Sequence, residues 1–211
     1  LLLATLYFAA WAILPSKANN TLYFAERWLP CALATLVIAA PAPRGGSGLR
    51  FVPALGLTLF MAGTTLLWHA AERTSLTGID EVLASLRERP RVLGLSFVQN
   101  RIFKGDPYLQ TFAWAQVARG GELNFSFADF AVALVVYREP RRFDWTLGLE
   151  WNPEWARPAD TRLFDAVIVS GDEWVHAWAQ QALGLEPVTT GGIWRLYRPA
   201  PGRRQPWAQP S

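Results

Sequence analysis

The uneven distribution of charge constrains this chain more than any other feature of its sequence. The chain of 211 residues contains 20 basic and 17 acidic residues, but few of them lie in the first third. The charged residues before position 71 are Lys17, Glu26, Arg27, Arg44 and Arg50. The rest of the chain carries equal numbers of acids and bases, so its net charge is zero. This division predicts two parts, an apolar part for membrane and a polar part for water.

Three apolar segments fill positions 1–70, and we expect them to be transmembrane helices. The segment at 1–14 is uncharged but shorter than the roughly 20 residues that a span needs, as a truncated span would be. The segment at 23–40 has Glu26 and Arg27 near its start, and the segment at 51–70 is uncharged and of full length. Buried core helices of a soluble protein are the alternative, but they require a larger partner core than the remaining chain can supply.

The loops between these segments predict an orientation. The short loop at 41–50 carries Arg44 and Arg50 without an acid, and short basic loops favour the cytoplasm. The third segment then leads outward. We therefore expect a multi-pass protein of the inner (plasma) membrane, in contact with the lipid bilayer. Positions 71–200 would form a periplasmic or other extracytoplasmic domain.

The polar part alternates between helical and strand patterns. Helices are predicted at 75–89, 108–119 and 172–183. Apolar runs predict buried strands at 91–98, 131–137 and 164–170, and positions 187–189 and 193–197 suit a closing hairpin. The expected fold class is therefore membrane α-helical segments followed by a small α/β domain, with a mixed sheet and flanking helices. We expect the Pro- and Arg-rich positions 201–211 to be a disordered tail.

Several kinds of chemistry find no support in the sequence. The only histidines are His69 and His176, and the single cysteine, Cys31, lies in an apolar run, so we predict no metal site and no disulfide. We expect His176 to be a surface or interface residue. There is no P-loop, no G-x-S-x-G and no dinucleotide-binding fingerprint, so we predict no catalytic residue and no cofactor. The neutral polar part also argues against nucleic acid as a partner.

The densest group of polar side chains lies at 99–129, where it alternates with aromatic residues. Hydrogen-bonding groups beside aromatic faces suit a sugar or a lipid headgroup. The predicted ligand-binding residues are Asn100, Lys104, Gln110, Glu122 and Asn124. The alternative is a helix packed on the sheet next to a capped polar loop.

Two further segments leave alternatives open. Ser170-Gly171-Asp172 follows a strand and opens a helix, which is where α/β proteins often bind ligands, although a simple turn with a helix cap fits better. The irregular segment at 139–161 is rich in tryptophan and arginine. It suits either the membrane surface or packing against the domain.

Several phrases resemble the C-terminal end of bacterial C-type membrane glycosyltransferases, the relatives of protein mannosyltransferases and lipid A aminoarabinose transferases. They are RERPRVLGLSF at 87–97, PYLQTFAWAQ at 107–116 before Arg119-Gly120-Gly121, the strand at 165–169, and GIWRLYR at 192–198. The order of the parts is also similar, with last transmembrane helices followed by a small α/β domain.

The resemblance implies transfer of a sugar from a polyprenyl-phosphate donor to a lipid or protein acceptor. The essential acid of that family lies in its first extracytoplasmic loop, and no acid of this chain matches it, so we expect the catalytic residue upstream of Leu1. The α/β domain would then have an accessory or acceptor-holding role. The alternative is a non-catalytic, membrane-anchored extracytoplasmic module for binding or assembly.

Overall fold

The fold is given by a computed structural model that describes residues 2–15, 17–18, 21–22, 28–39, 51–98, 108–129, 136–138 and 143–199. The chain divides into two compact units, Leu1–Met61 and Ala62–Ser211. The boundary falls inside one long helix. A single continuous element therefore belongs to both units.

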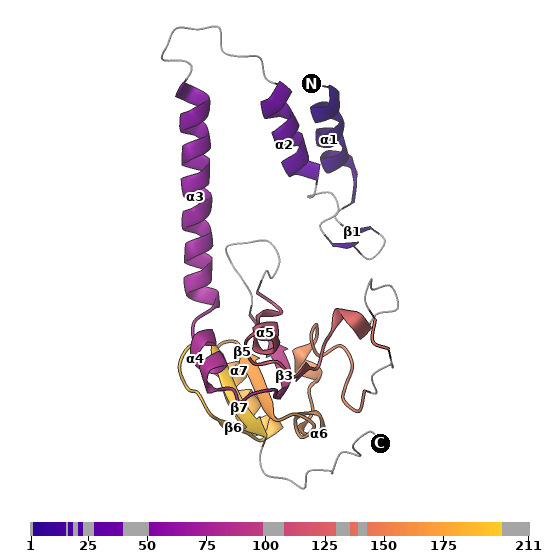
Figure 1. Cartoon of the computed structure of the whole chain (residues 1–211), viewed down its shortest axis with the longest axis vertical. Helices are drawn as coiled ribbons and strands as arrows, with labels where there is room; N and C mark the ends of the chain where they lie inside the picture. The colour runs from indigo at the N-terminus through magenta and orange to yellow at the C-terminus, as the bar shows by residue number, and fades with distance from the viewer. Residues whose placement is uncertain are drawn as a thin grey trace. The chain divides into compact units, whose positions relative to one another are not determined.

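The first unit is a pair of short apolar helices, α1 (Leu2–Ile13) and α2 (Trp28–Ala39), which lie side by side (Figure 1). Ala4 and Ala32 are buried, and small residues allow two helices to approach closely. Between the helices, β1 (Lys17–Ala18) and β2 (Thr21–Leu22) pair antiparallel. Each helix has 12 residues and is therefore about 18 Å long, less than the ~30 Å hydrocarbon thickness of a bilayer.

The long helix α3 (Val52–Ser75) continues from the third apolar segment and is longer than that segment predicts. Within the described ranges, its portion Ala54–Ser75 is the one helix that is long and apolar enough to cross a membrane. Among the described residues of the three expected spans, only this helix has sufficient length. The presence of the other two stays a prediction.

The second unit contains a five-stranded mixed sheet with strand order β4-β3-β5-β7-β6. The strands are β3 (Arg91–Ser96), β4 (Glu122–Leu123), β5 (Ala166–Ser170), β6 (Leu185–Pro187) and β7 (Trp194–Pro199). Strand β3 runs parallel to β4 and β5, whereas β7 runs antiparallel to β5 and β6. The predicted α/β domain with a mixed sheet and flanking helices is confirmed.

Both faces of the sheet are covered, which explains the uninterrupted apolar runs of its central strands. One face packs against α4 (Ile79–Ser85) and α5 (Trp114–Arg119), and the other against α7 (Glu173–Leu183). Strand β5 is buried along its whole length. The remaining short elements are the 3-10 turns η3 (Thr111–Ala113), η4 (Phe127–Asp129) and η5 (Pro153–Trp155), and the helix α6 (Pro158–Thr161).

The structure corrects two predicted helices. Of the helix expected at 75–89, only α4 (Ile79–Ser85) forms; α3 ends at Ser75, and a turn at Gly78, whose φ of 91° is left-handed, separates the two helices. A Cβ at Gly78 would lie 2.5 Å from the carbonyl oxygen of Trp194, so only glycine fits there. The helix expected at 108–119 begins with a turn and η3, and becomes an α-helix only at Trp114.

Two other predicted elements fall largely outside the described residues. In the strand expected at 131–137, only Val136 and Tyr137 are described, and both are exposed and outside any strand. The tail at 201–211 also lies outside the described residues.

The end of α3 is fixed to the sheet by hydrogen bonds. The indole Nε1 of Trp194 donates to the carbonyl oxygen of Ser75 at 2.7 Å. The backbone N–H groups of Ile193 and Trp194 both donate to the carbonyl oxygen of Thr77, at 2.9 and 3.0 Å. These bonds satisfy carbonyl groups that a helix end otherwise leaves unpaired, and they join α3 directly to strand β7.

Candidate functional site

A pocket with a largely apolar lining and a few polar groups lies in the second unit, between α4 and the segment that leads into α5. Its volume is about 610 Å³, within the range of small-molecule sites. Its lining residues are Leu76, Ile79, Asp80, Leu83, Tyr108, Gln110, Thr111 and Trp114. Leu76, from the turn after α3, lines the pocket together with Ile79 and Leu83 of α4, and the other lining residues come from about 30 positions later in the chain. The walls are largely apolar, and the polar groups are few.

Tyr108 is the most unusual residue of this pocket. Tyr108 is 9% exposed, and its ring packs edge-to-face on Trp68 of α3, with 6.5 Å between ring centroids. Its hydroxyl is buried and makes no hydrogen bond to any part of the chain that the structure describes. Burial raises the pKa of Tyr108, and the nearby charge of Glu72 raises it further, so the hydroxyl stays protonated and remains a donor.

The three predicted ligand-binding residues that the structure describes, Gln110, Glu122 and Asn124, do not gather in one place. Gln110 lines the pocket, whereas Asn100 and Lys104 lie outside the described residues. Glu122 is exposed on β4 and forms an ion pair with Arg91, with 3.2 Å between Nε and Oε2. A ligand role for these residues stays a prediction.

Asn124 is buried and has a clear structural contact. Its Oδ1 accepts a hydrogen bond of 2.8 Å from the backbone N–H of Gly94, which extends the link between β3 and β4. Its Nδ2 is buried and has no hydrogen-bond partner among the described residues. The close packing here continues on Gly94, where a Cβ would lie 2.1 Å from the ring of Phe112.

The turn at Ser170-Gly171-Asp172 is packed tightly. Ser170 and Ser96 end the parallel strands β5 and β3, and their hydroxyl groups form a buried hydrogen bond of 3.1 Å. The N–H of Gly171 donates to the carbonyl oxygen of Ile193. Asp172 occupies the N-cap position of α7, although its side chain forms no capping hydrogen bond. These contacts account for the turn without a ligand.

His176 is buried in the core, at 1% exposure, so the expectation of a surface or interface residue is wrong. Its Nε2 lies 3.0 Å from the carbonyl oxygen of Ile193, and its Nδ1 lies 3.1 Å from the hydroxyl of Tyr197. The carbonyl can only accept, so Nε2 carries the proton and Nδ1 accepts from Tyr197. His176 shares a helix face with Ala179 and Leu183, and this spacing was a signal of its burial.

The buried imidazole of His176 makes the domain sensitive to acid. Burial, with the nearby charge of Arg195, lowers the pKa of His176 below its ordinary value. The unfolded chain therefore binds a proton that the folded chain excludes, so stability falls as the pH drops below about 6.5. We expect the unfolding midpoint of the full chain in detergent to decrease from pH 7 to pH 5. His176→Gln should show a flatter profile over this interval, and an unchanged slope would contradict this account.

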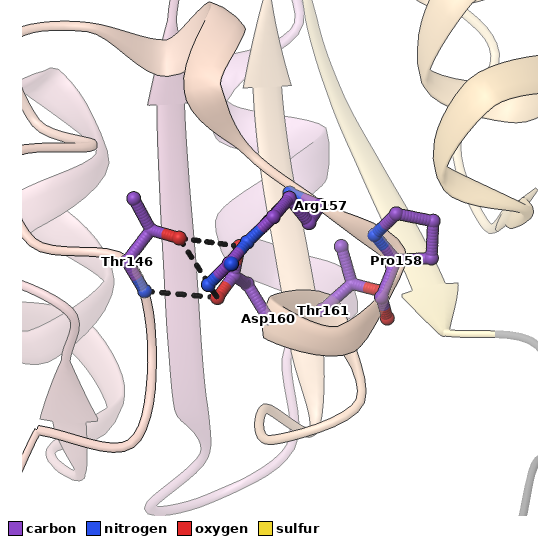
Figure 2. A network of polar contacts seen from close by, with 5 residues as sticks. All are labelled: Thr146, Arg157, Pro158, Asp160 and Thr161. Carbon is purple, nitrogen blue, oxygen red and sulfur yellow. Dashed lines mark hydrogen bonds and ion pairs between the residues drawn. The ribbon is translucent and has the colours of Figure 1, made fainter.

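A second buried polar network holds the irregular segment before β5 in place (Figure 2). The carboxylate of Asp160 is 1% exposed. It accepts hydrogen bonds from the backbone N–H groups of Thr146, at 2.8 Å, and Arg157, at 2.9 Å. The hydroxyl of Thr146 and the guanidinium of Arg157 also donate to it. All of its hydrogen-bonding capacity is used within the fold, which indicates a structural role.

The tryptophans of this segment divide between core and surface. Trp145 is buried and packs edge-to-face on Phe164, with 5.2 Å between centroids. Trp151 and Trp155 are each about half exposed, at 51% and 54%. Part of the segment therefore packs against the domain, and part presents aromatic rings outward.

Within the described ranges, no group of three or more His, Cys, Asp or Glu side chains is arranged to hold a metal ion. We take the pocket between α4 and the segment before α5 as the candidate site, because its lining joins apolar side chains with the hydroxyl of Tyr108, which is unpaired among the described residues. Comparisons with known protein families, with curated proteins and with solved structures found no match to this chain.

Proposed function

We propose that the chain is the C-terminal part of an integral membrane glycosyltransferase-like protein that uses a polyprenyl-phosphate sugar donor. In this proposal the α/β domain has an accessory or acceptor-holding role at the outer surface of the inner membrane. The catalytic acid lies upstream of Leu1. The observation that carries the proposal is the junction of an exposed apolar helix with an α/β domain that holds a largely apolar pocket.

The exposure of α3 supports its placement in a bilayer. Large apolar side chains project from it along most of its length, and Leu57, Phe60 and Leu66 are each more than 60% exposed. A helix that is apolar all round is stable either inside a large core or in a membrane. A core helix would be buried, and only 6% of the most apolar part of this helix is buried.

The pocket supports a binding role for the α/β domain. It is bounded by the turn that follows α3, and this turn is hydrogen-bonded to β7. A ligand held there would keep a fixed distance from the membrane helix. This geometry suits a domain that holds an amphiphilic acceptor while the chemistry proceeds elsewhere.

The second candidate is a non-catalytic, membrane-anchored extracytoplasmic module for binding or assembly. The fully internal bonding of Asp160 gives this acid a structural role, which fits either candidate because neither places proton transfer in the α/β domain. The two candidates share the membrane placement. They differ in whether the complete protein transfers a sugar.

The first step of the test is orientation. The variant Cys31→Ser/Glu154→Cys places a single thiol on the exposed residue Glu154, and Cys31→Ser/Ser47→Cys places one in the basic loop. We expect a membrane-impermeant maleimide to label position 154 in cells with a permeabilised outer membrane. Position 47 should become labelled only after the inner membrane is opened. The reverse pattern would contradict the orientation.

The second step is sugar transfer by the complete protein in lipid nanodiscs. We expect a labelled polyprenyl-phosphate sugar to be consumed and its sugar to appear on a lipid or protein acceptor. Substitution of the upstream acid should abolish this transfer. If topology is as expected but no transfer occurs with any acceptor fraction, the binding and assembly module is the better description.

A further inference from the structure

The pocket lies where a lipid from the bilayer would reach the domain. Its wall residue Tyr108 packs against Trp68, which is located near the C-terminal end of α3. Tryptophan is enriched at the membrane–water interface, so a bilayer around α3 would end near this residue. This step rests on the membrane placement in the proposed function, and it does not depend on sugar transfer.

The shape and the walls of the pocket suit a hydrocarbon chain. Leu76, Ile79 and Leu83 form one side, and Trp114 forms part of the other. Trp114 is 59% exposed and Leu76 is partly buried, so the apolar surface continues to the outside. Burial of apolar surface is the main favourable term for such a chain.

The hydroxyl of Tyr108, unpaired among the described residues, suits an occupant that carries a hydrogen-bond acceptor. A buried polar group without a hydrogen bond destabilises a fold, and most buried polar groups in proteins have a hydrogen-bond partner. The Tyr108 hydroxyl has no hydrogen-bond partner among the described residues, although its residue lines a pocket. An occupant with an oxygen that accepts a hydrogen bond would satisfy it.

The charges around the pocket select against an anionic headgroup. Asp80 is on the wall, and the charge of Glu72 acts on Tyr108. None of the described residues on the wall is basic. A phosphate beside Asp80 would be repelled, whereas a hydroxyl group can donate a hydrogen bond to Asp80.

We propose that this pocket binds an uncharged membrane lipid that carries ester and hydroxyl groups. One hydrocarbon chain lies between α4 and α5, an ester oxygen accepts a hydrogen bond from Tyr108, and a hydroxyl donates to Asp80. The occupant is thus distinct from a polyprenyl-phosphate donor. It is a neutral lipid on the acceptor side of the proposed function.

The test uses the full chain in nanodiscs with two photoreactive probes. One is a diacylglycerol with a diazirine in one acyl chain, and the other is a phosphatidate with the same chains. After irradiation, mass spectrometry maps the labelled peptides. We expect the diacylglycerol to label 76–83 and 108–114 at least about 5-fold more than the phosphatidate does, a ratio that about 1 kcal/mol of charge repulsion produces. Equal labelling, or stronger labelling by the phosphatidate, would overturn the proposal.

Two variants connect the label to the pocket, and one serves as a matched control. Leu83→Trp fills the pocket and should remove the label, whereas Val117→Trp adds the same side chain at a site on α5 that is 73% exposed, and should not. Tyr108→Phe keeps the ring and removes one hydrogen bond, so labelling should fall about 5-fold. Without lipid, the same variant should unfold at a higher temperature than the parent. Unchanged labelling in Tyr108→Phe would overturn the role of the hydroxyl.

The experiments distinguish a failure of this inference from a failure of the proposed function. If position 154 is labelled from outside and sugar transfer occurs, but neither probe reaches the pocket, this inference alone fails. If the neutral probe labels the pocket and no transfer occurs, the inference stands and the non-catalytic module is favoured. Labelling of neither the pocket nor α3 would overturn both.

Discussion

Asp160→Asn is expected to destabilise the second unit by about 3 kcal/mol, because it leaves buried backbone donors without a full acceptor. The carboxylate of Asp160 accepts the N–H of Thr146 on one oxygen and the N–H of Arg157 on the other. An asparagine offers one oxygen, so its amide nitrogen must face a donor. Urea unfolding of the full chain in detergent, followed by tryptophan fluorescence, measures the change.

The matched control is Asp144→Asn, which removes one carboxylate from an exposed position in the same segment. Exposed substitutions usually change stability by less than about 0.5 kcal/mol, so the two variants should differ clearly. If Asp160→Asn matched this control, the network in Figure 2 would not hold the segment in place.

Acid should reduce the difference between Asp160→Asn and the parent. Burial alone raises the pKa of Asp160, but the hydrogen bonds from Arg157 and Thr146 outweigh burial and hold the pKa below its ordinary value. The stability contributed by this carboxylate is therefore complete above about pH 4. It is lost as the pH falls through the folded pKa. The same urea titrations between pH 7 and pH 3 should show the two curves converge.

The central strands were predictable because a strand that is buried on both faces has an uninterrupted run of apolar residues. The apolar runs at 91–98 and 164–170 became β3 and β5, and the predicted closing hairpin became β6 and β7. Strand β4 was missed, because two residues are too few to show the alternation of apolar and polar side chains that marks a strand. The split at Gly78 was also missed, since its cause is the close approach of the Trp194 backbone, which is far away in the sequence.

The candidate site was harder to predict, because it joins two segments that the sequence separates. The residues Leu76, Ile79 and Leu83 followed a helical spacing that indicates a packed face, and nothing local showed that a pocket interrupts that packing. Polar composition indicated Gln110, but it also indicated Asn124, whose amide instead holds Gly94. The missing hydrogen bond of Tyr108 depends on its three-dimensional neighbours, so composition could not reveal it.

Trp194→Ala is expected to cost about 4 kcal/mol, the largest effect of a single substitution that we predict. Trp194 is fully buried on β7, and its side chain packs in the core shared with α4 and α5. Its indole also donates to Ser75 at the end of α3. The substitution therefore removes core volume and one of the bonds that fix the helix end to the sheet. The same urea titration measures the total loss.

Two companion variants separate volume from hydrogen bonding. Trp194→Phe keeps most of the volume and loses the bond to Ser75, so we expect a smaller cost of about 1–2 kcal/mol. Trp174→Ala removes a tryptophan that is 65% exposed, and should cost less than either.

Hydrogen exchange shows whether Trp194 fixes the end of α3 to the sheet or only fills the core. Trp194→Phe should increase hydrogen exchange at residues 75–78, because the carbonyl groups of this turn lose part of their bonding to β7. Exchange in β3 should change little, since β3 pairs with β4 and β5 and is not bonded to β7. If exchange rose equally in both places, Trp194 would stabilise the core without fixing α3. The candidate pocket would then lack the fixed distance from the membrane helix on which its proposed role depends.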